Sequence, residues 1–278
     1  MILEDIINKT HCSDCNIFME ALPPECVDLV VTSPPYDSLR TYKGYTFDYK
    51  TTANNLYRVL KQGGIVVWIV NDATINGSET GSSFKQALYF KEIGFNLHDT
   101  MIWAKPHSAH PSSNRYNQEF EYIFIFSKGK PKTFNPIKDV PTKWIKSFGK
   151  ASCRLKNGEI KQQECSTIYN KTHMRGNVWR AKTVSQENIC QRPPHPAIFP
   201  MGLVSDLILS WSNKNDLVYD PFGGSGTTGR CCIRLKRNWI MTEISKDYCE
   251  IIEREILDEI QKNTINTKQN SIGEYRRF

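Results

Sequence analysis

The sequence has no long apolar run, and its first twenty residues contain no continuous apolar stretch. A membrane-spanning helix needs about 18 to 20 apolar residues, so we expect no membrane segment. Glu4, Asp5 and Asp14 do not fit a secretory signal, and we therefore expect a cytoplasmic protein. The 278 residues are 39% hydrophobic and 23% charged, which excludes disordered, collagen-like and coiled-coil chains. A chain of 278 residues is long enough for one large α/β domain with an insertion, or for two modest domains.

The chain also lacks paired sets of metal-binding cysteines. Its nine cysteines are an odd number and are scattered, so we interpret them as free thiols in a reducing compartment. Cys12 and Cys15 form a C-x-x-C pair, but a zinc site would need a second pair of ligands nearby. We therefore expect ordinary thiols and no metal.

The net charge of +7 is concentrated in one stretch of the chain. Residues 128–192 contain 15 Lys and Arg against 4 Asp and Glu, whereas the rest of the chain contains 21 against 25. Aromatic and hydrogen-bonding residues alternate with this charge. Such a mixture suits contacts to phosphates and base edges, and a solvated basic surface is the alternative. We interpret the stretch as an inserted, loop-rich recognition lobe, with these candidate nucleic-acid contacts: Lys143, Trp144, Lys171, His173, Arg175 and Arg180.

Apolar periodicity predicts alternating strands and helices on both sides of this stretch. Before it, we expect strands at 27–32, 65–70, 97–103 and 122–126, and helices at 82–93 and at 54–62, the latter closed by Gly63 and Gly64. After it, we expect strands at 216–219 and 238–241, helices at 199–210, 227–235 and 246–262, and a polar tail that frays after Thr264. Strands joined by crossover helices form a mostly parallel, doubly wound sheet, so the predicted fold class is α/β.

A glycine-rich turn follows the strand expected at 216–219, with the sequence Asp220-Pro221-Phe222-Gly223-Gly224-Ser225-Gly226-Thr227-Thr228. Glycines permit positive φ and let a ligand approach the backbone, and the following helix offers unpaired N–H groups to an anion. A phosphate-binding P-loop would need a lysine where Thr227 stands. Glu243 ends the next strand about twenty residues later, where a carboxylate can hold the hydroxyls of a ribose. The turn therefore predicts an adenosine-type cofactor rather than a flexible linker.

A second motif, Thr32-Ser33-Pro34-Pro35-Tyr36, ends the strand expected at 27–32. It should lie at the carboxyl edge of the sheet, where α/β folds bind ligands. The two prolines fix φ and remove two N–H donors, so the backbone presents rigid carbonyl acceptors. Acceptors beside the flat face of Tyr36 suit an amino group on a planar ring. A proline-terminated strand with a core tyrosine is the alternative.

Together and in this order, the two motifs resemble those of the β-class amino-group DNA methyltransferases, over roughly residues 10 to 255. The resemblance implies a Rossmann-like methyltransferase domain of residues 1–127 and 193–278 in circularly permuted order, with residues 128–192 as the target-recognition region. It implies S-adenosyl-L-methionine (AdoMet) as the cofactor, double-stranded DNA as the partner, and Ser33, Pro34, Pro35 and Tyr36 as catalytic residues. The residues implied to bind the cofactor are Asp14, Cys15, Thr32, His195, Pro196, Phe199, Asp220, Pro221, Phe222, Gly223, Gly224, Ser225, Gly226, Thr227, Thr228 and Glu243. Asn114-Arg115-Tyr116 resembles a loop that faces DNA, which makes Arg115 a further candidate contact.

The expected target base depends on one residue of the Thr32–Tyr36 motif. Family members with Ser at the position of Ser33 mostly methylate N4 of cytosine, and those with Asp mostly N6 of adenine, so the resemblance favours cytosine N4, with adenine N6 as the alternative. Methylation at carbon 5 would need a thiolate nucleophile, usually after a proline, and the sequence has no Pro-Cys pair.

The same resemblance implies a biological setting. We expect a bacterial restriction-modification system with a cognate restriction endonuclease as functional partner, and we expect the protein to be a monomer or homodimer. An RNA amino-methyltransferase and a non-catalytic DNA-binding module are the less favoured alternatives, because the former usually carries Asn or Asp before Pro-Pro and the latter would not need an intact cofactor loop.

Overall fold

The computed structural model describes residues 2–35, 47–105, 114–141, 150–164, 172–181 and 199–275. The chain divides into two compact units. The larger, called the sheet unit, comprises residues 1–135 and 177–278, and the smaller, called the hairpin unit, comprises residues 136–176. Among the described residues, no helix is both long and apolar enough to cross a membrane.

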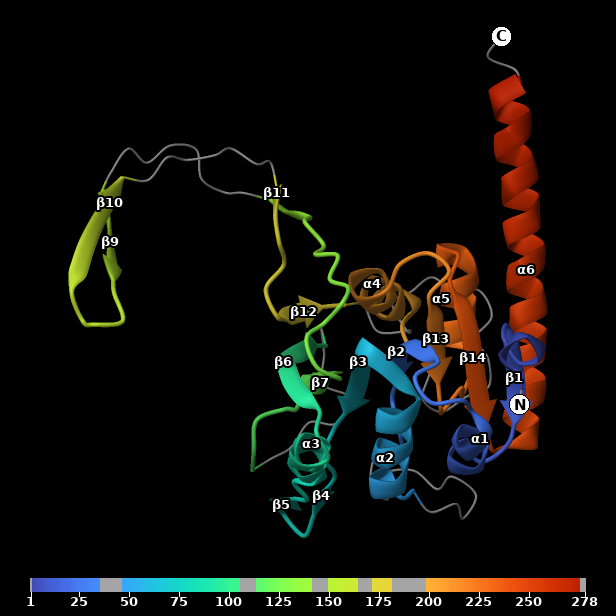
Figure 1. Ribbon diagram of the computed structural model, residues 1–278, viewed down its shortest axis with the longest axis horizontal. Coiled ribbons are helices and arrows are strands. Elements are labelled where there is room, and N and C mark those ends of the chain that lie inside the picture. Colours follow the sequence, from blue (N-terminus) through green and yellow to red (C-terminus); the bar gives the residue numbers. More distant parts are fainter. Residues whose placement is uncertain are drawn as a thin grey trace. The chain divides into compact units, whose positions relative to one another are not determined.

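The sheet unit is built on one eight-stranded sheet with the strand order β1-β14-β13-β2-β3-β7-β6-β12 (Figure 1). β7 runs antiparallel to both of its neighbours, and all other adjacent pairs are parallel. In sheet order the strands are β1 (Lys9–Cys12), β14 (Asn238–Glu243), β13 (Leu217–Asp220), β2 (Val27–Thr32), β3 (Leu60–Val70), β7 (Phe120–Ser127), β6 (Asn96–Ala104) and β12 (Val178–Arg180).

Two groups of helices cover the sheet. α1 (Cys15–Ala21), α2 (Tyr49–Val59) and α3 (Ser82–Glu92) contact one another in sequence order along one face. α4 (Met201–Trp211), α5 (Thr227–Leu235) and α6 (Lys246–Tyr275) do the same along the other face. The predicted α/β class with a mostly parallel, doubly wound sheet is therefore confirmed.

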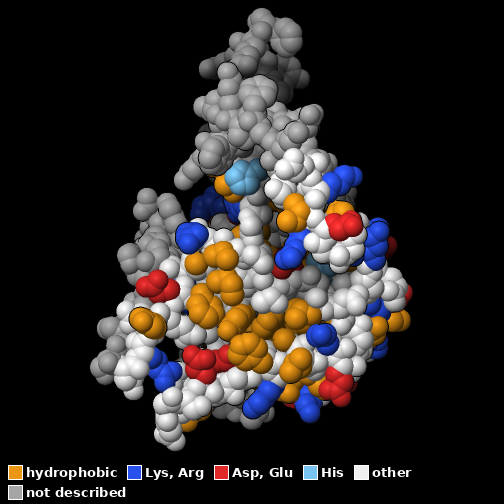
Figure 2. Space-filling model, turned by 90° about the vertical axis from the view of Figure 1, so that its left-hand side faces the viewer, with side chains coloured by type: hydrophobic (Ala, Val, Ile, Leu, Met, Phe, Trp, Pro, Cys, Tyr) orange, Lys and Arg blue, Asp and Glu red, His pale blue; other side chains and the backbone are white. Residues whose placement is uncertain are grey.

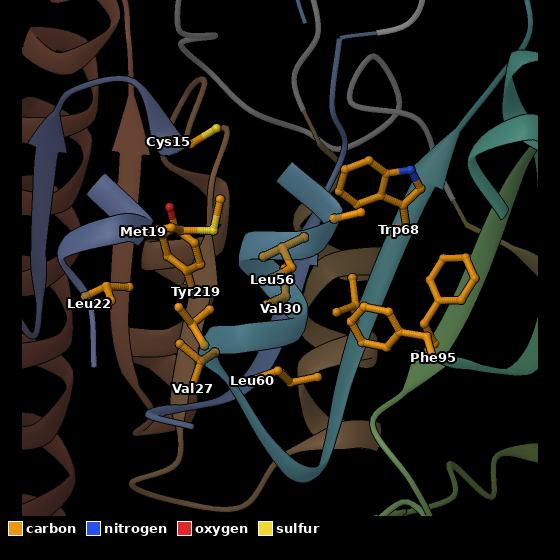
Figure 3. Packing of buried hydrophobic residues seen from close by; sticks show 14 of the residues in the cluster. Cys15, Met19, Leu22, Val27, Val30, Leu56, Leu60, Trp68, Phe95 and Tyr219 are labelled. Carbon is orange, nitrogen blue, oxygen red and sulfur yellow. The ribbon is translucent and has the colours of Figure 1, made fainter. Parts of the chain in front are cut away.

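The main core lies between the sheet and the helices α1 to α3. Every residue of β3 from Ile65 to Val70 is at most 1% exposed, as predicted for a strand that is buried on both faces. Met19 of α1 and Leu56 of α2 pack against Trp68 and Tyr219 of the sheet in one cluster (Figure 3). This packing fixes the strand ends that carry the predicted site.

Two predicted helix ends are wrong. The helix expected at 54–62 starts at Tyr49 and ends at Val59. It ends early because Leu60 pairs with Val27 and begins β3, so the glycines expected to stop the helix lie inside a strand. α6 continues past Thr264 to Tyr275, since no glycine or proline interrupts it before Gly273.

The described residues of the hairpin unit form two short antiparallel pairs. β8 (Val140–Pro141) pairs with β11 (Thr172–His173), and β9 (Lys150–Arg154) pairs with β10 (Ile160–Glu164). The guanidinium of Arg175 forms an ion pair with Asp139, and this contact lowers the pKa of the Asp139 carboxyl.

The limits of this unit differ from those of the basic stretch 128–192. Residues 128–135 and 177–180 belong to the sheet unit. In β12, Trp179 pairs with Trp103 of β6 and is 9% exposed, so its indole is packed at the sheet edge and is not displayed for base contacts. That the remainder of the basic stretch recognises DNA stays a prediction.

On the side of the sheet unit where β6 and α3 lie, hydrophobic side chains gather at the surface (Figure 2). α3 exposes Phe84 by 49% and Leu88 by 65%. The Phe84 ring contacts Tyr122 of β7, with 5.4 Å between ring centroids. α3 therefore carries exposed apolar side chains as well as a ring that packs on the sheet.

Candidate active site at the carboxyl edge of the sheet

The predicted site residues follow four adjacent strands at one edge of the sheet. In the order of the strands, these residues are Asp14 after β1, Glu243 on β14, Asp220 on β13 and Thr32 on β2. The strands are parallel, so their carboxyl ends meet at one edge. The sheet thus brings together residues that are more than two hundred positions apart in the sequence.

Asp220 connects the two motifs directly. Its Oδ1 accepts hydrogen bonds from the Thr32 hydroxyl at 2.7 Å and from the N–H of Phe222 at 3.1 Å. Its Oδ2 accepts a hydrogen bond from the Thr228 hydroxyl at 2.6 Å. Asp220 is 2% exposed, and burial raises the pKa of its carboxyl to about 7, against the opposing effect of the Thr228 and Thr32 hydrogen bonds. Both carboxylate oxygens therefore hold the chain's own groups, and they tie the end of β2 to the glycine turn.

The glycine turn has the backbone conformation that its sequence predicts. Gly224 and Gly226 have φ of +55° and +79°, values that side chains disfavour. The N–H of Gly226 donates to the carbonyl of Gly223 at 2.8 Å, and α5 begins directly afterwards at Thr227. The turn thus leads straight into a helix N-terminus, where N–H groups are available to an anion.

Gly223 and Gly226 are also required for a reason that the sequence analysis missed. A Cβ on Gly223 would lie 3.1 Å from Cδ1 of Ile252, and a Cβ on Gly226 would lie 3.2 Å from Cγ2 of the same side chain. Ile252 belongs to α6 and is fully buried. α6 is therefore the element that approaches these glycines closely. No local sequence motif indicates its contact with the turn.

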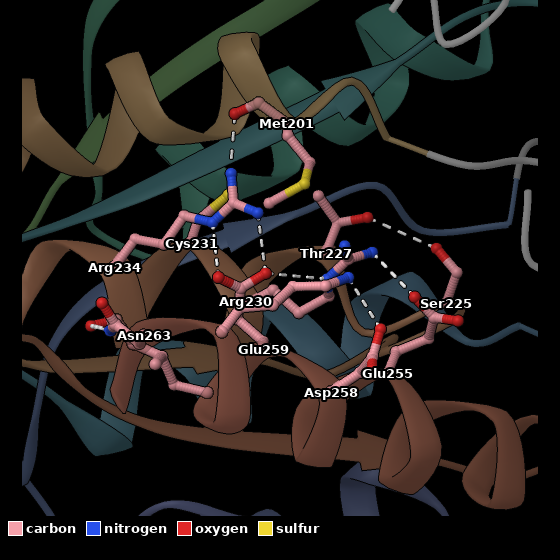
Figure 4. Close-up of polar contacts among 12 residues, drawn as sticks. Met201, Ser225, Thr227, Arg230, Cys231, Arg234, Glu255, Asp258, Glu259 and Asn263 are labelled. Atoms are coloured by element: carbon pink, nitrogen blue, oxygen red, sulfur yellow. Dashed lines mark hydrogen bonds and ion pairs between the residues drawn. The ribbon is translucent and has the colours of Figure 1, made fainter. Parts of the chain in front are cut away.

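Ion pairs between α5 and α6 hold Ile252 in this position (Figure 4). Arg230 contacts Glu255 at 3.0 Å, and Arg234 contacts Glu259 at 2.6 Å. Glu259 is 3% exposed and the side chain of Arg234 is 47% exposed, so only the carboxylate of this ion pair is buried. The two helices therefore support the back of the turn as one packed layer.

Glu243 supports the turn from β14. Its Oε2 accepts a hydrogen bond from the N–H of Gly224 at 2.9 Å, and its Oε1 accepts one from the N–H of Ser245 at 2.9 Å. Burial raises the pKa of this carboxyl. An ionised carboxylate has about four acceptor positions, more than these hydrogen bonds use, so acceptor capacity remains for a ligand.

Asp14 caps α1 at the neighbouring strand end. Its Oδ1 accepts hydrogen bonds from the N–H groups of Asn16 at 2.7 Å and Ile17 at 3.2 Å, and its Oδ2 makes no hydrogen bond to a described residue. The adjacent Cys15 is 7% exposed, and burial raises the pKa of its thiol to about 12. The carboxylate of Asp14 thus offers one oxygen to a ligand, whereas the thiol of Cys15 belongs to the core.

The second motif begins at the end of β2. Thr32 is fully buried and pairs with Trp68 of β3, while Ser33 and Pro35 are half-buried and Pro34 is buried. The Trp68 indole donates to Oε1 of Gln86 at 2.8 Å, and the Phe222 ring lies 6.5 Å from the indole between centroids. An aromatic layer from β3 and the glycine turn therefore lies beside this motif. Trp68 and Gln86 were not among the predicted site residues, because an apolar run and a helical glutamine carry no functional signal.

The remaining predicted residues have different outcomes. The Thr227 hydroxyl contacts the carbonyl of Phe199 at 3.4 Å, which brings the segment before α4 to the glycine turn. The guanidinium of Arg115 donates to Thr74 and Gly77, and Arg180 is exposed on β12. Outside the described residues lie Tyr36, Lys143, Trp144, Lys171, His195 and Pro196. In the described part of the chain, no group of three or more His, Cys, Asp or Glu could hold a metal ion.

Comparison with known proteins identifies the family. Residues 27–254 match a family described as DNA methylase, the N6 and N4 methyltransferases. The orphan methyltransferase M.BamHII of Bacillus amyloliquefaciens is 51% identical over 247 residues, which cover 87% of this chain and 89% of that protein. The solved PvuII DNA methyltransferase, described as cytosine-N4-specific, has a TM-score of 0.64 at 22% identity and covers 91% of each chain.

A second solved structure has the same fold with a ligand. A DNA modification methylase of Thermus thermophilus, in complex with S-adenosyl-L-methionine, has a TM-score of 0.60 at 22% identity, over 90% of this chain and 95% of that one. The chain belongs to the DNA methylase family of N6 and N4 methyltransferases.

Proposed function

We propose that this DNA methyltransferase transfers a methyl group from AdoMet to the exocyclic N4 amine of cytosine in a specific duplex sequence. The observation that carries the proposal is the 2.7 Å hydrogen bond from Thr32 to Asp220, which joins the Ser33–Pro34 corner to the glycine turn. A methyl donor on the turn and an amine at the corner would therefore share one edge of the sheet.

The residues at this edge fit AdoMet as the cofactor. Its adenosine carries an amino group and two ribose hydroxyls, which are donors, and its methionine end carries a carboxylate. Asp14 offers a carboxylate oxygen for the amino group, and Glu243 retains acceptor positions for the hydroxyls. The N-terminus of α5 suits the cofactor's carboxylate. When bound, AdoMet supplies an electrophilic methyl group on a sulfonium.

The catalytic residues act on the target amine. Its lone pair is delocalised into the ring, and hydrogen bonds from its two hydrogens to the Ser33 hydroxyl and the Pro34 carbonyl would localise that pair on nitrogen. The same acceptors would stabilise the positive charge that develops there. Tyr36 would hold the extruded base by stacking. No side chain needs to form a covalent bond to the base: the amine nitrogen would take the methyl carbon as the bond from that carbon to sulfur breaks, S-adenosylhomocysteine would be left, and the methylated amine would release one proton to solvent.

Cytosine N4 is proposed over adenine N6 on the strength of Ser33. The description of the PvuII enzyme as cytosine-N4-specific supports this choice, and adenine N6 is the second candidate. A restriction-modification system with a cognate endonuclease is the proposed setting, and a methyltransferase without an endonuclease partner, as M.BamHII is described, is the alternative.

One experiment tests the reaction and the base together. The purified protein is incubated with unmethylated genomic DNA and isotope-labelled AdoMet, and the DNA is digested to nucleosides and analysed by mass spectrometry. We expect labelled N4-methylcytosine, and labelled N6-methyladenine alone would contradict the proposed base. Total RNA in a parallel reaction distinguishes an RNA methyltransferase. Tyr36→Ala is expected to retain AdoMet binding and to lose most turnover, and equal loss of both would contradict the role of Tyr36.

A further inference from the structure

The segment that leads into β7 is held at both ends by side-chain hydrogen bonds. The Arg115 guanidinium donates to the Thr74 hydroxyl at 3.2 Å and to the Gly77 carbonyl at 2.7 Å. Both acceptors belong to the small hairpin of β4 (Thr74–Ile75) and β5 (Ser78–Glu79). Gln118 donates to Oδ1 of Asn71 at 2.7 Å. The segment from residue 115 to residue 118 is thereby fixed to the end of β3 and to the hairpin.

Tyr116 lies between these two anchors and is 100% exposed. A single exposed apolar residue usually needs no explanation, because much of any protein surface is apolar. Tyr116 differs because residues on either side of it hold its backbone in place. The arrangement presents a large aromatic ring to solvent on a supported loop, and none of the described residues packs on the ring.

The loop lies at the same edge of the sheet as Ser33. β7 is antiparallel, so its first residues, Phe120 to Tyr122, lie at the carboxyl ends of its neighbours, and Tyr122 pairs with Val70, the last residue of β3. Only β3 lies between β7 and β2. Two strand spacings correspond to about 10 Å across the sheet. The loop that carries Tyr116 and the proposed catalytic corner thus lie at the same edge of the sheet.

We propose that Tyr116 inserts its ring into the base stack of the duplex beside the target nucleotide and occupies the space that the extruded base leaves. This proposal rests on the function proposed above. A target base must leave the duplex before its amine can reach an active site, and the unpaired helix then loses stacking contacts. Apolar and aromatic side chains replace such contacts when they enter between base steps. Arg115 acts as a positioning residue, since its hydrogen bonds hold the loop from the hairpin.

The test compares a paired with a mismatched target. The recognition sequence is first read from methylated positions in the DNA of a host that expresses the protein. Short duplexes then carry this sequence with the target base either paired or mismatched, since a mismatched base costs less to extrude. Methyl transfer by the wild type, Tyr116→Ala and Tyr116→Phe is measured on both duplexes, and AdoMet affinity is measured separately. Leu257→Ala, which truncates a side chain that is 60% exposed on α6, is the control.

Insertion of the Tyr116 ring predicts a specific pattern of methyl-transfer rates on the two duplexes. Tyr116→Ala is expected to lower the rate on the paired duplex by at least about tenfold, to come within about threefold of the wild type on the mismatched duplex, and to keep its AdoMet affinity. Tyr116→Phe keeps the ring and is expected to behave as the wild type. Equal losses by the Ala variant on both duplexes, a Phe variant as slow as the Ala variant, or an Ala variant as fast as the wild type would each overturn the proposal. A wild type that transfers no methyl group to DNA would instead contradict the proposed function.

Discussion

Two parts of the carboxyl edge of the sheet are built in opposite ways. At the ends of β13 and β14, Asp220 and Glu243 are 2% and 9% exposed, and both oxygens of each carboxylate accept hydrogen bonds from the chain. At the end of β3 and the start of β7, hydrogen bonds lie at the surface, and Tyr116 is fully exposed. The first part is called the cofactor side below, and the second the substrate side.

The difference fits what each part is proposed to bind. A small cofactor is the same in every turnover, so a turn that is shaped in advance by buried groups binds it without a cost of reorganisation. A DNA duplex is large, approaches from outside and must be deformed, which requires exposed groups on supported loops. We therefore expect substitutions on the cofactor side to affect stability and AdoMet binding together, and substitutions on the substrate side to affect DNA methylation alone.

The largest effect is expected for Asp220→Ala. The substitution leaves two buried donors, the hydroxyls of Thr32 and Thr228, and one partly buried donor, the N–H of Phe222, without their acceptor. Each such group costs about 1–3 kcal/mol, so we expect the free energy of unfolding to fall by about 3 kcal/mol or more and AdoMet affinity to fall at least about tenfold. Chemical denaturation and calorimetric titration measure the two quantities.

Asp258→Ala is the matched control for this substitution. Asp258 pairs with Lys262 on the surface of α6, and its side chain is 58% exposed. Its loss should change neither quantity appreciably. Normal AdoMet binding by a folded Asp220→Ala protein would contradict the proposed difference between the two sides, because the turn would then not depend on its buried carboxylate.

The second effect is a dependence of stability on pH. Burial raises the pKa of the Asp220 carboxyl from 3.8 to about 7. An acid whose pKa is raised in the folded state contributes stability that is complete below the unfolded pKa and is lost as the pH rises through the folded pKa. The advantage of the wild type over Asp220→Asn in free energy of unfolding should therefore decrease between about pH 4 and pH 7, by at most about 4 kcal/mol.

Denaturation of both proteins across this pH range measures that difference. Glu243, whose pKa burial also raises, is present in both proteins, so most of its effect cancels in the comparison. An advantage that stays constant or grows with pH would show that the Thr32 and Thr228 hydrogen bonds outweigh burial. Asp220 would then be ionised throughout, and the cofactor side would be better described as a set of charge-assisted hydrogen bonds.

The sequence predicted the local parts of this edge and missed the long-range ones. The helix at 227–235 has the predicted bounds, because its glycine start and its amphipathic spacing are both local signals. The helix end expected at Gly63 was wrong because pairing of Leu60 with a distant strand outweighed a local stop signal. The same limit hid Ile252 behind the glycine turn, and it also left Trp179 assigned to the basic stretch although it packs in the sheet. Local motifs therefore indicate the candidate site, whereas the contacts that support it depend on tertiary packing.

A third prediction concerns the contact between the turn and α6. In Gly223→Ala the new Cβ would lie 3.1 Å from Cδ1 of Ile252 and 3.3 Å from the carbonyl of Thr242. We expect a loss of about 1–2 kcal/mol in the free energy of unfolding and weaker AdoMet binding. Ile252→Val removes Cδ1 and alone costs about 1 kcal/mol.

The double variant Gly223→Ala, Ile252→Val should therefore be more stable than the sum of the two single losses predicts. Recovery should be partial, since the Thr242 carbonyl stays in place. Gly176→Ala is the control, because a Cβ there meets no atom within 4 Å. Strictly additive losses would mean that Ile252 does not limit the space at Gly223. They would contradict the inference that α6 supports the turn.

The smallest effect on stability is expected for a substitution of Arg115 on the substrate side. This substitution tests whether the substrate side affects DNA methylation without affecting stability. Its hydrogen bonds to Thr74 and Gly77 lie at the surface, so Arg115→Ala should change the free energy of unfolding by less than about 1 kcal/mol and leave AdoMet affinity unchanged. Methyl transfer to duplex DNA should nevertheless fall, since the loop that carries Tyr116 loses its anchor.

Arg115→Lys separates anchoring from charge, because lysine keeps the charge but cannot reproduce the two directed hydrogen bonds of the guanidinium. If anchoring is the role of Arg115, the Lys variant should transfer methyl groups as slowly as the Ala variant. A Lys variant that is as fast as the wild type, with a rate that falls steeply as salt is added, would instead make Arg115 a phosphate contact.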